Sequence, residues 1–252
     1  MFLWISVAMH AALLALLVRS RTLTLVVLAG YGIYHGFLAW GVLHPRSRLF
    51  GPNRSRLTTD ERVVALTFDD GPHPDVTPRV LEILRASGVH ATFFLVGKHV
   101  ERHPDIVRRI AEEGHTLGCH SFDHSYLFWL LSAGRLMREV RASKAAVEAA
   151  SGLPCRWFRA PVGMKNCFLQ PVLARSGLEL VSWDLRFLES RSGDRAGLDR
   201  RLQRRVSPGS ILLLHDGHDR RAEGNPAVLE ALPRVLSAIA AMGYRCVPLP
   251  RS

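Results

Sequence analysis

The chain has 252 residues, of which 48% are hydrophobic and 22% charged, and its formal net charge is +11. This length accommodates one large domain plus a short appendage, and the excess of arginine suits anionic lipid, phosphate or carboxylate partners. The basic residues are spread over many predicted helices without a nucleic-acid-binding motif, and the four cysteines form no C-x-x-C pair, which argues against a nucleic-acid-binding protein and a disulfide framework.

Two apolar stretches open the chain, at residues 2–18 and 23–43, and a short polar segment separates them. The second stretch reaches the ~20 residues that a bilayer-spanning helix needs, and the first is at the short end of that range. No Lys or Arg precedes the first stretch, which argues against a cleaved signal peptide. We therefore expect a hairpin of two transmembrane helices over residues 1–43, with a linker over residues 44–62.

The distribution of arginine around these stretches bears on membrane topology. Arg19 and Arg21 lie between the two stretches, and four arginines follow the second one: Arg46, Arg48, Arg54 and Arg56. The positive-inside rule then favours the cytoplasmic side for both termini and for the rest of the chain. We expect the membrane to be a bacterial-type inner (cytoplasmic) membrane. Because the two arginine counts differ by only a small number, the side on which the domain lies stays open.

From residue 63 onward, short apolar runs alternate with helical patterns, as in parallel strands joined by crossover helices. Thr77 and Pro78 are expected to be the cap and the first turn of one helix, and Pro104 is expected to open another; Gly88 and Gly114 predict the corresponding ends. The predicted strands are residues 63–68, 91–96, 115–119, 156–159, 178–183, 211–214 and 244–247. This pattern predicts an α/β barrel of about seven strands, with its site at the carboxyl ends of the strands.

Two adjacent acids, Asp69 and Asp70, lie where the first predicted strand breaks into the turn Gly71-Pro72. Adjacent side chains on an extended strand point to opposite sides, so the two carboxylates share a role only if the turn re-aims one of them. We expect one carboxylate to bind a cation and the other to handle a proton.

His120 and His124 follow another short strand, four residues apart, and could bind one ion. Two histidines and one carboxylate with open positions are a common arrangement for hydrolytic zinc, and Asp70 is the natural third ligand. The H-x-x-x-H spacing alone is more often a coincidence. Its combination with the double aspartate predicts a metal site.

Two more strand ends carry polar residues. Arg159 is followed by the rigid turn Pro161-Val162-Gly163, where the guanidinium could orient a carboxylate and a backbone N–H could face a reacting oxygen. His215 comes directly after an apolar strand, and its ability to switch protonation near neutral pH makes it a candidate general acid.

Together these motifs resemble the polysaccharide deacetylases of the NodB-homology type, carbohydrate esterase family four. The matching pieces, in chain order, are Thr-Phe-Asp-Asp-Gly-Pro, His-Ser-x-x-His, Arg-x-Pro-x-Gly and Leu-x-His. The resemblance covers about residues 62–252 and implies a distorted (β/α) barrel that holds a divalent metal, usually zinc. It also implies hydrolysis of N-acetyl groups on amino sugars.

The resemblance also implies roles for individual residues. Asp69 would be the general base, Arg159 its partner and His215 the general acid. The metal ligands would be Asp70, His120 and His124, and the Val162 backbone N–H would serve the oxyanion. Side chains expected to line the substrate site are Pro161, Trp183 and Leu213.

The chain departs from the family pattern at two places. Val162 stands where the family often has a tyrosine, which keeps the backbone donor and removes a ring from the sugar subsite. In the fourth motif, Arg186 occupies the position of the aspartate that usually tunes the catalytic histidine. Glu189 and Asp184 are the two carboxylates that could substitute for it.

The leading hypothesis is a membrane-anchored, metal-dependent hydrolase that removes an N-acyl group, most simply acetyl, from an amino sugar in a polysaccharide, oligosaccharide or lipid-linked glycan. The alternative, motivated by the altered fourth motif, is a non-catalytic, metal-containing carbohydrate- or lipid-binding module of the same fold. The sequence leaves open the sugar, the acyl group, the metal used in vivo and the oligomeric state.

Overall fold

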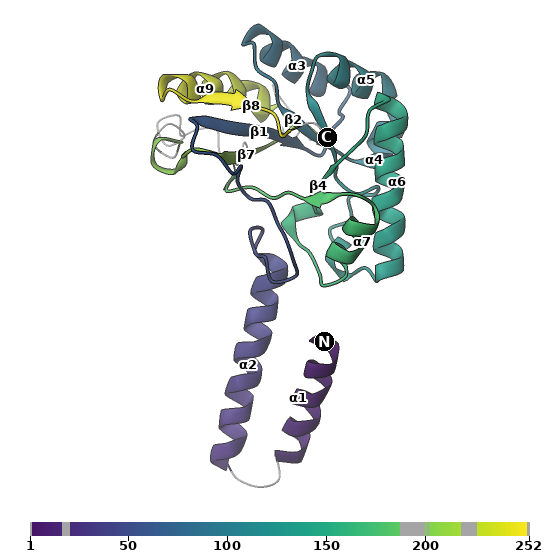
Figure 1. Ribbon diagram of the computed structural model, residues 1–252, viewed down its shortest axis with the longest axis vertical. Helices are drawn as coiled ribbons and strands as arrows, with labels where there is room; N and C mark the ends of the chain where they lie inside the picture. The colour runs from purple at the N-terminus through teal and green to yellow at the C-terminus, as the bar shows by residue number, and fades with distance from the viewer. Residues whose placement is uncertain (1, 17–20, 187–199, 201, 218–225, 251–252) are drawn as a thin grey trace.

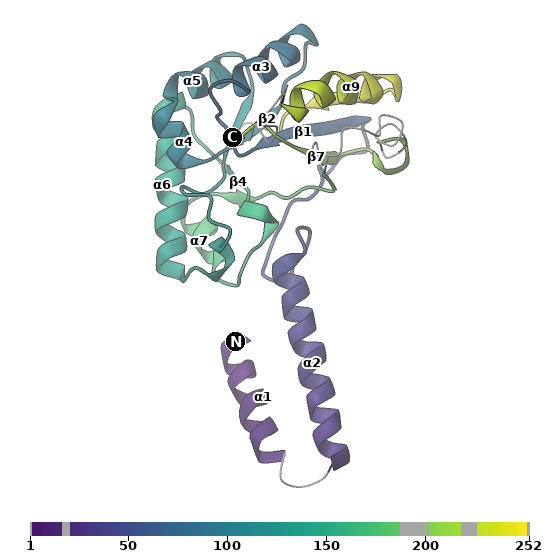
Figure 2. The ribbon, with the colours of Figure 1, turned by 180° about the vertical axis from the view of Figure 1, so that it is seen from behind.

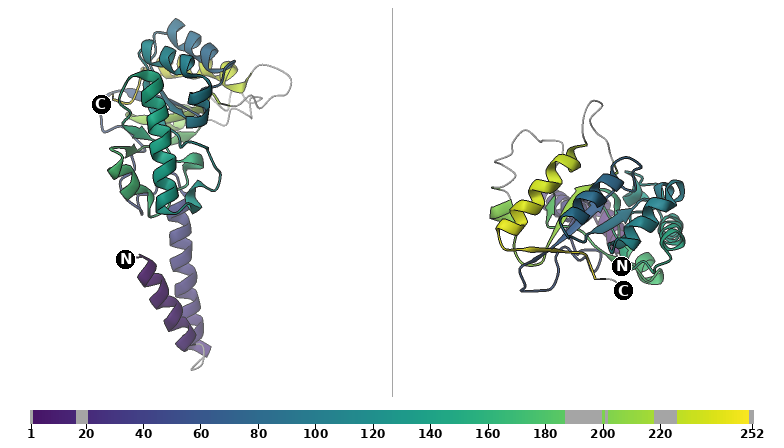
Figure 3. Two further views of the ribbon diagram at one scale, coloured as in Figure 1. Left: turned by 90° about the vertical axis from the view of Figure 1, so that its right-hand side faces the viewer. Right: turned by 90° about the horizontal axis from the view of Figure 1, so that it is seen from above.

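A computed structural model describes residues 2–16, 21–186, 200, 202–217 and 226–250. Helices α1 (Phe2–Leu16) and α2 (Arg21–Leu43) form an antiparallel pair, and α2 leads into an α/β domain (Figure 1). The two helices project together from one side of the domain, as the rotated view also shows (Figure 3).

The domain is built on one parallel sheet. Its strands are β1 (Val63–Asp69), β2 (Thr92–Leu95), β3 (Thr116–Cys119), β4 (Trp157–Phe158), β5 (Glu179–Leu180), β6 (Leu185–Arg186), β7 (Ser210–His215) and β8 (Arg245–Val247). The order is β5-β4-β3-β2-β1-β7-β6, with β8 paired to the first half of β1. The sheet is curled, and it is an open half-barrel because β5 and β6, at opposite ends of this order, do not pair with each other in the described part of the chain. Each of the seven predicted runs contains a strand, and β6 is the strand that the sequence did not indicate.

Helices pack on the outer face of this sheet, as the view from behind shows (Figure 2). Pro104 begins a helix as predicted, and Pro78 lies in the first turn of another, but Thr77 is the first helical residue of that helix and not its cap, because Val76 occupies the N-cap position. Gly88 and Gly114 follow the ends of the two helices with positive φ angles of 63° and 88°. The helices of the domain are α3 (Thr77–Ala86), α4 (Gly97–Arg102), α5 (Pro104–Glu112), α6 (Ala133–Ser151), α7 (Leu169–Arg175) and α9 (Ala227–Ala241), with 3₁₀ turns η1 (Phe128–Leu130) and η2 (Pro161–Gly163).

The central strand β1 is buried on both faces, and its side chains alternate between two cores. Val64, Leu66 and Phe68 pack into the large core beneath the helices, whereas Ala65 belongs to a smaller core on the concave face. Since side chains alternate along a strand, Asp69 falls on the same concave side as Ala65. The strand therefore delivers its terminal carboxylate into the half-barrel.

The expectation of two transmembrane helices is corrected by the helix lengths. Among the described residues, one helical segment, Thr24–Leu43, is long and apolar enough to cross a membrane, with a mean hydropathy of 1.5 over its best window. Helix α1 has 15 residues and is about 22 Å long, shorter than the ~30 Å of a hydrocarbon core.

The expected linker, residues 44–62, packs along the domain instead of forming a free tether. Asn53 is buried and Arg54 forms a parallel bridge with the segment after β5, where its N–H bonds to the carbonyl of Leu180 (2.9 Å). The Leu57 N–H bonds to the carbonyl of Gly209 (2.7 Å). These contacts fix the path from α2 into β1.

Candidate metal and catalytic site

Polar residues from four strand ends meet at one edge of the sheet. Asp69 ends β1, His120 follows β3, Arg159 follows β4 and His215 ends β7. The parallel register of β1 and β7 pairs Asp69 directly with His215. Carboxyl ends of parallel strands share one edge, so residues up to 146 positions apart in sequence become neighbours.

The turn after β1 brings both acids to the same imidazole. Asp70 has a φ of 76°, in the left-handed region that non-glycine residues adopt rarely. His120 Nε2 consequently lies 3.3 Å from Asp70 Oδ1 and 3.7 Å from Asp69 Oδ2. Neighbouring side chains on an extended strand would point to opposite sides. The positive φ of Asp70 instead turns its carboxylate toward the same imidazole as that of Asp69.

Asp70, His120 and His124 offer a compact donor set for a metal ion. Their ligand atoms all lie within 4.8 Å of one another, and His124 Nε2 is 3.0 Å from Asp70 Oδ1. His120 Nδ1 is 2.8 Å from the carbonyl of Arg159, a bond that places the proton on Nδ1 and leaves the Nε2 lone pair toward the cluster. Two imidazole nitrogens and one carboxylate oxygen fit a divalent ion such as zinc.

The electrostatics of the same cluster also favour a cation. Burial lowers the pKa of His120, but the neighbouring carboxylates of Asp69 and Asp70 outweigh it and raise that pKa above its ordinary value. Two buried carboxylates thus concentrate negative charge around this imidazole, which a bound cation would offset.

Arg159 forms a buried ion pair with Asp69. Its Nη1 donates to Asp69 Oδ1 at 2.6 Å and to Thr67 Oγ1 at 2.8 Å, and its Nη2 donates to the carbonyl of Ser182 at 3.1 Å. The guanidinium also lies 4.0 Å from the centre of the Phe94 ring. These contacts hold the Asp69 carboxylate in one orientation.

The turn after Arg159 has unusual backbone geometry. Val162 has a φ of 57°, which is rare for a β-branched residue. Within the described part of the chain, its N–H makes no hydrogen bond to another protein group. Gly163 follows with a φ of 74°, and a β-carbon there would come within 2.7 Å of Trp183 and 3.1 Å of Pro45. The turn thus presents a free donor and has no space for a larger residue at position 163.

The residues expected to line the substrate site are all buried. Pro161 is buried in η2, Trp183 is 8% exposed, and Leu213 is 1% exposed within the concave core. Leu213 therefore packs in the interior of the half-barrel and has almost no solvent-accessible surface.

The carboxylates proposed to tune His215 are not near it where the structure describes them. Asp184 accepts hydrogen bonds from Ser210 Oγ (2.9 Å) and Ile211 N–H (2.7 Å), and it pairs with Arg56 at 2.6 Å. Ser210 begins β7 and His215 ends it, about 16 Å away along an extended strand. Asp184 therefore braces the start of β7. Arg186 is exposed in β6, and Glu189 lies outside the described residues.

Asp216 is a buried acid at the site that sequence reasoning missed. Its N–H donates to the carbonyl of Asp69 (3.1 Å), and its Oδ2 accepts from Thr77 Oγ1 (2.6 Å). Burial raises the pKa of Asp216 to about 7, against the hydrogen bond from Thr77. The available signal was its position directly after His215, behind a wholly apolar strand.

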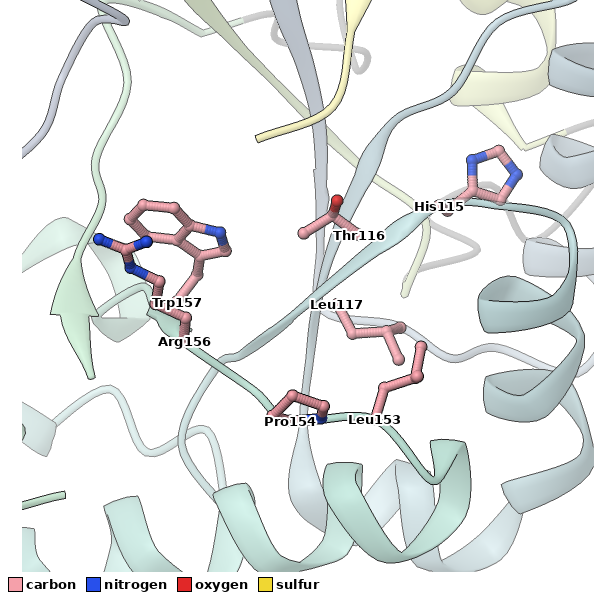
Figure 4. Close-up of a pocket in the computed structure, with 7 residues that line it drawn as sticks. All are labelled: His115, Thr116, Leu117, Leu153, Pro154, Arg156 and Trp157. Atoms are coloured by element: carbon pink, nitrogen blue, oxygen red, sulfur yellow. The ribbon is translucent and has the colours of Figure 1, made fainter. Parts of the chain in front are cut away.

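A pocket lies at the opposite ends of the strands (Figure 4). It is lined by residues around the starts of β3 and β4 and beyond the end of α6: His115, Thr116, Leu117, Leu153, Pro154, Arg156 and Trp157. None of the motif residues contributes to it, so it is separate from the cluster described above.

Comparison with known proteins gives consistent matches. The polysaccharide deacetylase family profile matches residues 56–181. A chitooligosaccharide deacetylase of Azorhizobium caulinodans is 35% identical over 208 residues, covering 78% of this chain and 97% of the relative. A peptidoglycan-N-acetylglucosamine deacetylase of Bacillus cereus is 32% identical over 191 residues, covering 75% of this chain and 86% of the relative.

A solved structure shares the fold. The crystal structure of the Bc1960 peptidoglycan N-acetylglucosamine deacetylase superimposes with a TM-score of 0.71 at 26% identity. The alignment covers 79% of this chain and 91% of that one.

Proposed function

The chain belongs to the polysaccharide deacetylase family of hydrolases, and from this membership we propose that it removes an N-acyl group, most simply acetyl, from an amino sugar of a glycan. The observation that carries the proposal is the buried Asp69–Arg159 pair beside the Asp70, His120 and His124 donor set. A base with a fixed orientation next to a metal-binding cluster is an arrangement that supports amide hydrolysis by water.

In the proposed mechanism, Asp70, His120 and His124 would hold a divalent metal, which we propose to be zinc. A zinc ion bound there would polarise the amide carbonyl and acidify a water molecule. Asp69, oriented by Arg159, takes the proton of the attacking water.

The remaining steps use the other strand ends. As water adds to the carbonyl carbon, the developing negative charge on oxygen is met by the N–H of Val162. His215 then donates a proton to the nitrogen as the C–N bond breaks. The products are a carboxylic acid and a free amino sugar.

We propose that the polypeptide is divided into a membrane part (residues 1–43), a connecting segment (44–62) and a catalytic domain (63–252). Only 6% of the apolar window within Thr24–Leu43 is buried in the protein, which supports α2 as an anchor in a bacterial inner membrane. The relatives named above are deacetylases of chitooligosaccharide and of peptidoglycan N-acetylglucosamine. An N-acetylglucosamine glycan is therefore the substrate class to test first.

The direct test is acetate release from N-acetylated chitooligosaccharides by the zinc-loaded full chain in detergent. Asp69→Asn should lower turnover by at least about a hundredfold, because general-base catalysis typically contributes 10²–10⁴-fold. Asp60→Asn, which alters an exposed aspartate of the connecting segment, is the matched control and should leave turnover unchanged. Sugar binding without any acetate release would favour the non-catalytic alternative.

A further inference from the structure

The end of α2 is bonded directly to the loop that carries part of the site. Lys165 is buried, and its Nζ donates to the carbonyls of His44 (2.8 Å) and Pro45 (3.2 Å). Its N–H donates to the carbonyl of Val42 (3.3 Å), inside α2. The ring of Pro45 also packs against Gly163 of the turn after Arg159. The site is therefore held against the end of the membrane helix and not on a free tether.

Four large apolar side chains are exposed on the two loops next to this junction. We call them the apolar rim: Tyr126 (65% exposed), Leu127 (60%), Leu130 (59%) and Phe168 (47%). Single exposed apolar residues are ordinary, but several on neighbouring loops mark a surface that contacts a partner.

The apolar rim connects the candidate metal site to the α2 junction. At one end, the Tyr126 ring lies 5.9 Å from the ring of His124, a proposed ligand. At the other, Asn166, which directly follows Lys165, donates from Nδ2 to the carbonyls of Trp129 (2.9 Å) and Leu131 (3.0 Å). This side chain ties the two loops together, so the rim is a defined surface.

The position of α2 identifies what covers the rim. The 20-residue span Thr24–Leu43 is about 30 Å long, which places its last turn at the membrane interface when α2 crosses a bilayer. Trp40, 47% exposed, has the location typical of an interfacial aromatic residue, and Arg46 and Arg48 are exposed just beyond it, where they can meet anionic headgroups. In Figure 1, α7 and the adjoining end of α6 lie on the α2 side of the domain.

We infer that the apolar rim enters the headgroup region of the bilayer beside α2, and that the site takes an N-acylated amino sugar carried by a membrane lipid. This inference rests on the proposed function and names its substrate class. A rim held at the interface brings His124 to the level of lipid headgroups, where a lipid-linked sugar resides.

Cys167 allows the position of the rim to be measured independently of activity. It is an exposed thiol between Asn166 and Phe168, so it can carry an environment-sensitive fluorophore in a Cys246→Ser background. In vesicles of phosphatidylcholine and phosphatidylglycerol, lipids with a nitroxide near the headgroup should quench this label. The control carries the label at Arg85→Cys, exposed at the far end of α3, with Cys167→Ser, and should not be quenched. Equal quenching at both positions, or none at Cys167, overturns the insertion.

Activity measurements on a lipid-linked and on a soluble substrate show which of the two the site takes. We expect the full chain in vesicles to hydrolyse polyprenyl-phosphate-linked N-acetylglucosamine, and Leu130→Glu to lower its kcat/KM about tenfold while a soluble chitooligosaccharide is affected less than about twofold. The control Leu153→Glu changes an exposed leucine (41%) that lines the pocket at the opposite ends of the strands, and it should affect neither substrate. Hydrolysis of the soluble substrate alone, or equal losses on both, overturns the inference and leaves the proposed function intact. Hydrolysis of neither substrate rejects the proposed function, whereas quenching at Cys167 still decides whether the rim inserts.

Discussion

Arg159 donates a 2.6 Å hydrogen bond from Nη1 to Oδ1 of Asp69, and both side chains are buried. The bond joins the end of β1 to the residue after β4, 90 positions later in the chain. A buried pair of this kind stabilises the fold only while both partners are present, because removing one leaves an uncompensated charge.

Removing the Arg159 guanidinium alone should therefore lower the stability of the protein more than removing both members of the ion pair. Arg159→Met is expected to lower the stability of the protein by about 3 to 5 kcal/mol and to abolish activity. The double variant Asp69→Asn with Arg159→Met should be more stable than Arg159→Met alone, since no unpaired charge remains. Melting temperatures of the full chain in detergent measure both effects. A double variant that melts at or below the single one would contradict the role of the ion pair.

Loss of one ligand should abolish metal binding. His124→Ala leaves two of the three donor groups, so we expect the zinc content to fall from about one ion per chain toward zero. Zinc should raise the melting temperature of the chelator-treated wild type and not that of the variant, because a ligand stabilises only the state that binds it. His90→Ala, at an exposed histidine, is the control. Unchanged zinc content in His124→Ala would exclude this residue as a ligand.

The left-handed backbone conformation of Val162 predicts that glycine at this position would stabilise the protein without loss of activity. A non-glycine residue in the left-handed region costs on the order of 1 to 3 kcal/mol, and glycine adopts it freely at a smaller entropic cost. Val162→Gly should keep the N–H donor, retain activity within about threefold and raise the melting temperature. A large loss of turnover at full stability would show that the valine side chain itself contacts substrate.

Asp216 makes stability depend on pH. Its folded pKa of about 7 lies above the ordinary 3.8, so between these values the folded protein holds a proton that the unfolded chain has released. The contribution of Asp216 to stability therefore falls as pH rises from about 4 to about 7, in total on the order of 4 kcal/mol. Asp216→Asn removes this loss, so its melting temperature relative to wild type should increase over that window. The melting temperatures are measured on chelator-treated protein. A difference in melting temperature between the variant and wild type that does not change with pH would contradict the raised pKa of Asp216.

Lys165 should couple α2 to the site. Lys165→Ala leaves the carbonyls of His44 and Pro45 without this donor and opens a space beneath the junction. We expect a loss of about 1 to 3 kcal/mol in stability and a lower kcat, because Gly163 and its turn lose their support. Lys144→Ala removes a partly buried lysine, 26% exposed, that bonds to the Ser176 carbonyl, and should leave kcat unchanged. Equal kcat values in the two variants would show that the junction has no effect on the site.

The sequence by itself determined the elements and the types of chemistry. Each predicted apolar run contains a strand, and two helices have a proline in the first turn where the sequence predicted their starts, because hydrophobic periodicity and the fixed φ of proline act over a few positions. The double aspartate and the His120–His124 spacing indicated a metal site and a base, because the residues within each of these motifs also lie within a few positions of each other in the sequence. The composition also indicated the apolar span that ends at Leu43.

The tertiary structure alone decided which of these pieces meet. The strand order β5-β4-β3-β2-β1-β7-β6 brings Arg159 to Asp69, and the φ of Asp70 turns both acids toward His120. The tertiary structure also places Asp184 at the opposite end of β7 from His215, and it brings Lys165 into hydrogen-bonding contact with the end of α2. Such contacts depend on how distant strands pair and on single backbone angles, and neither leaves a periodic signal in the local sequence.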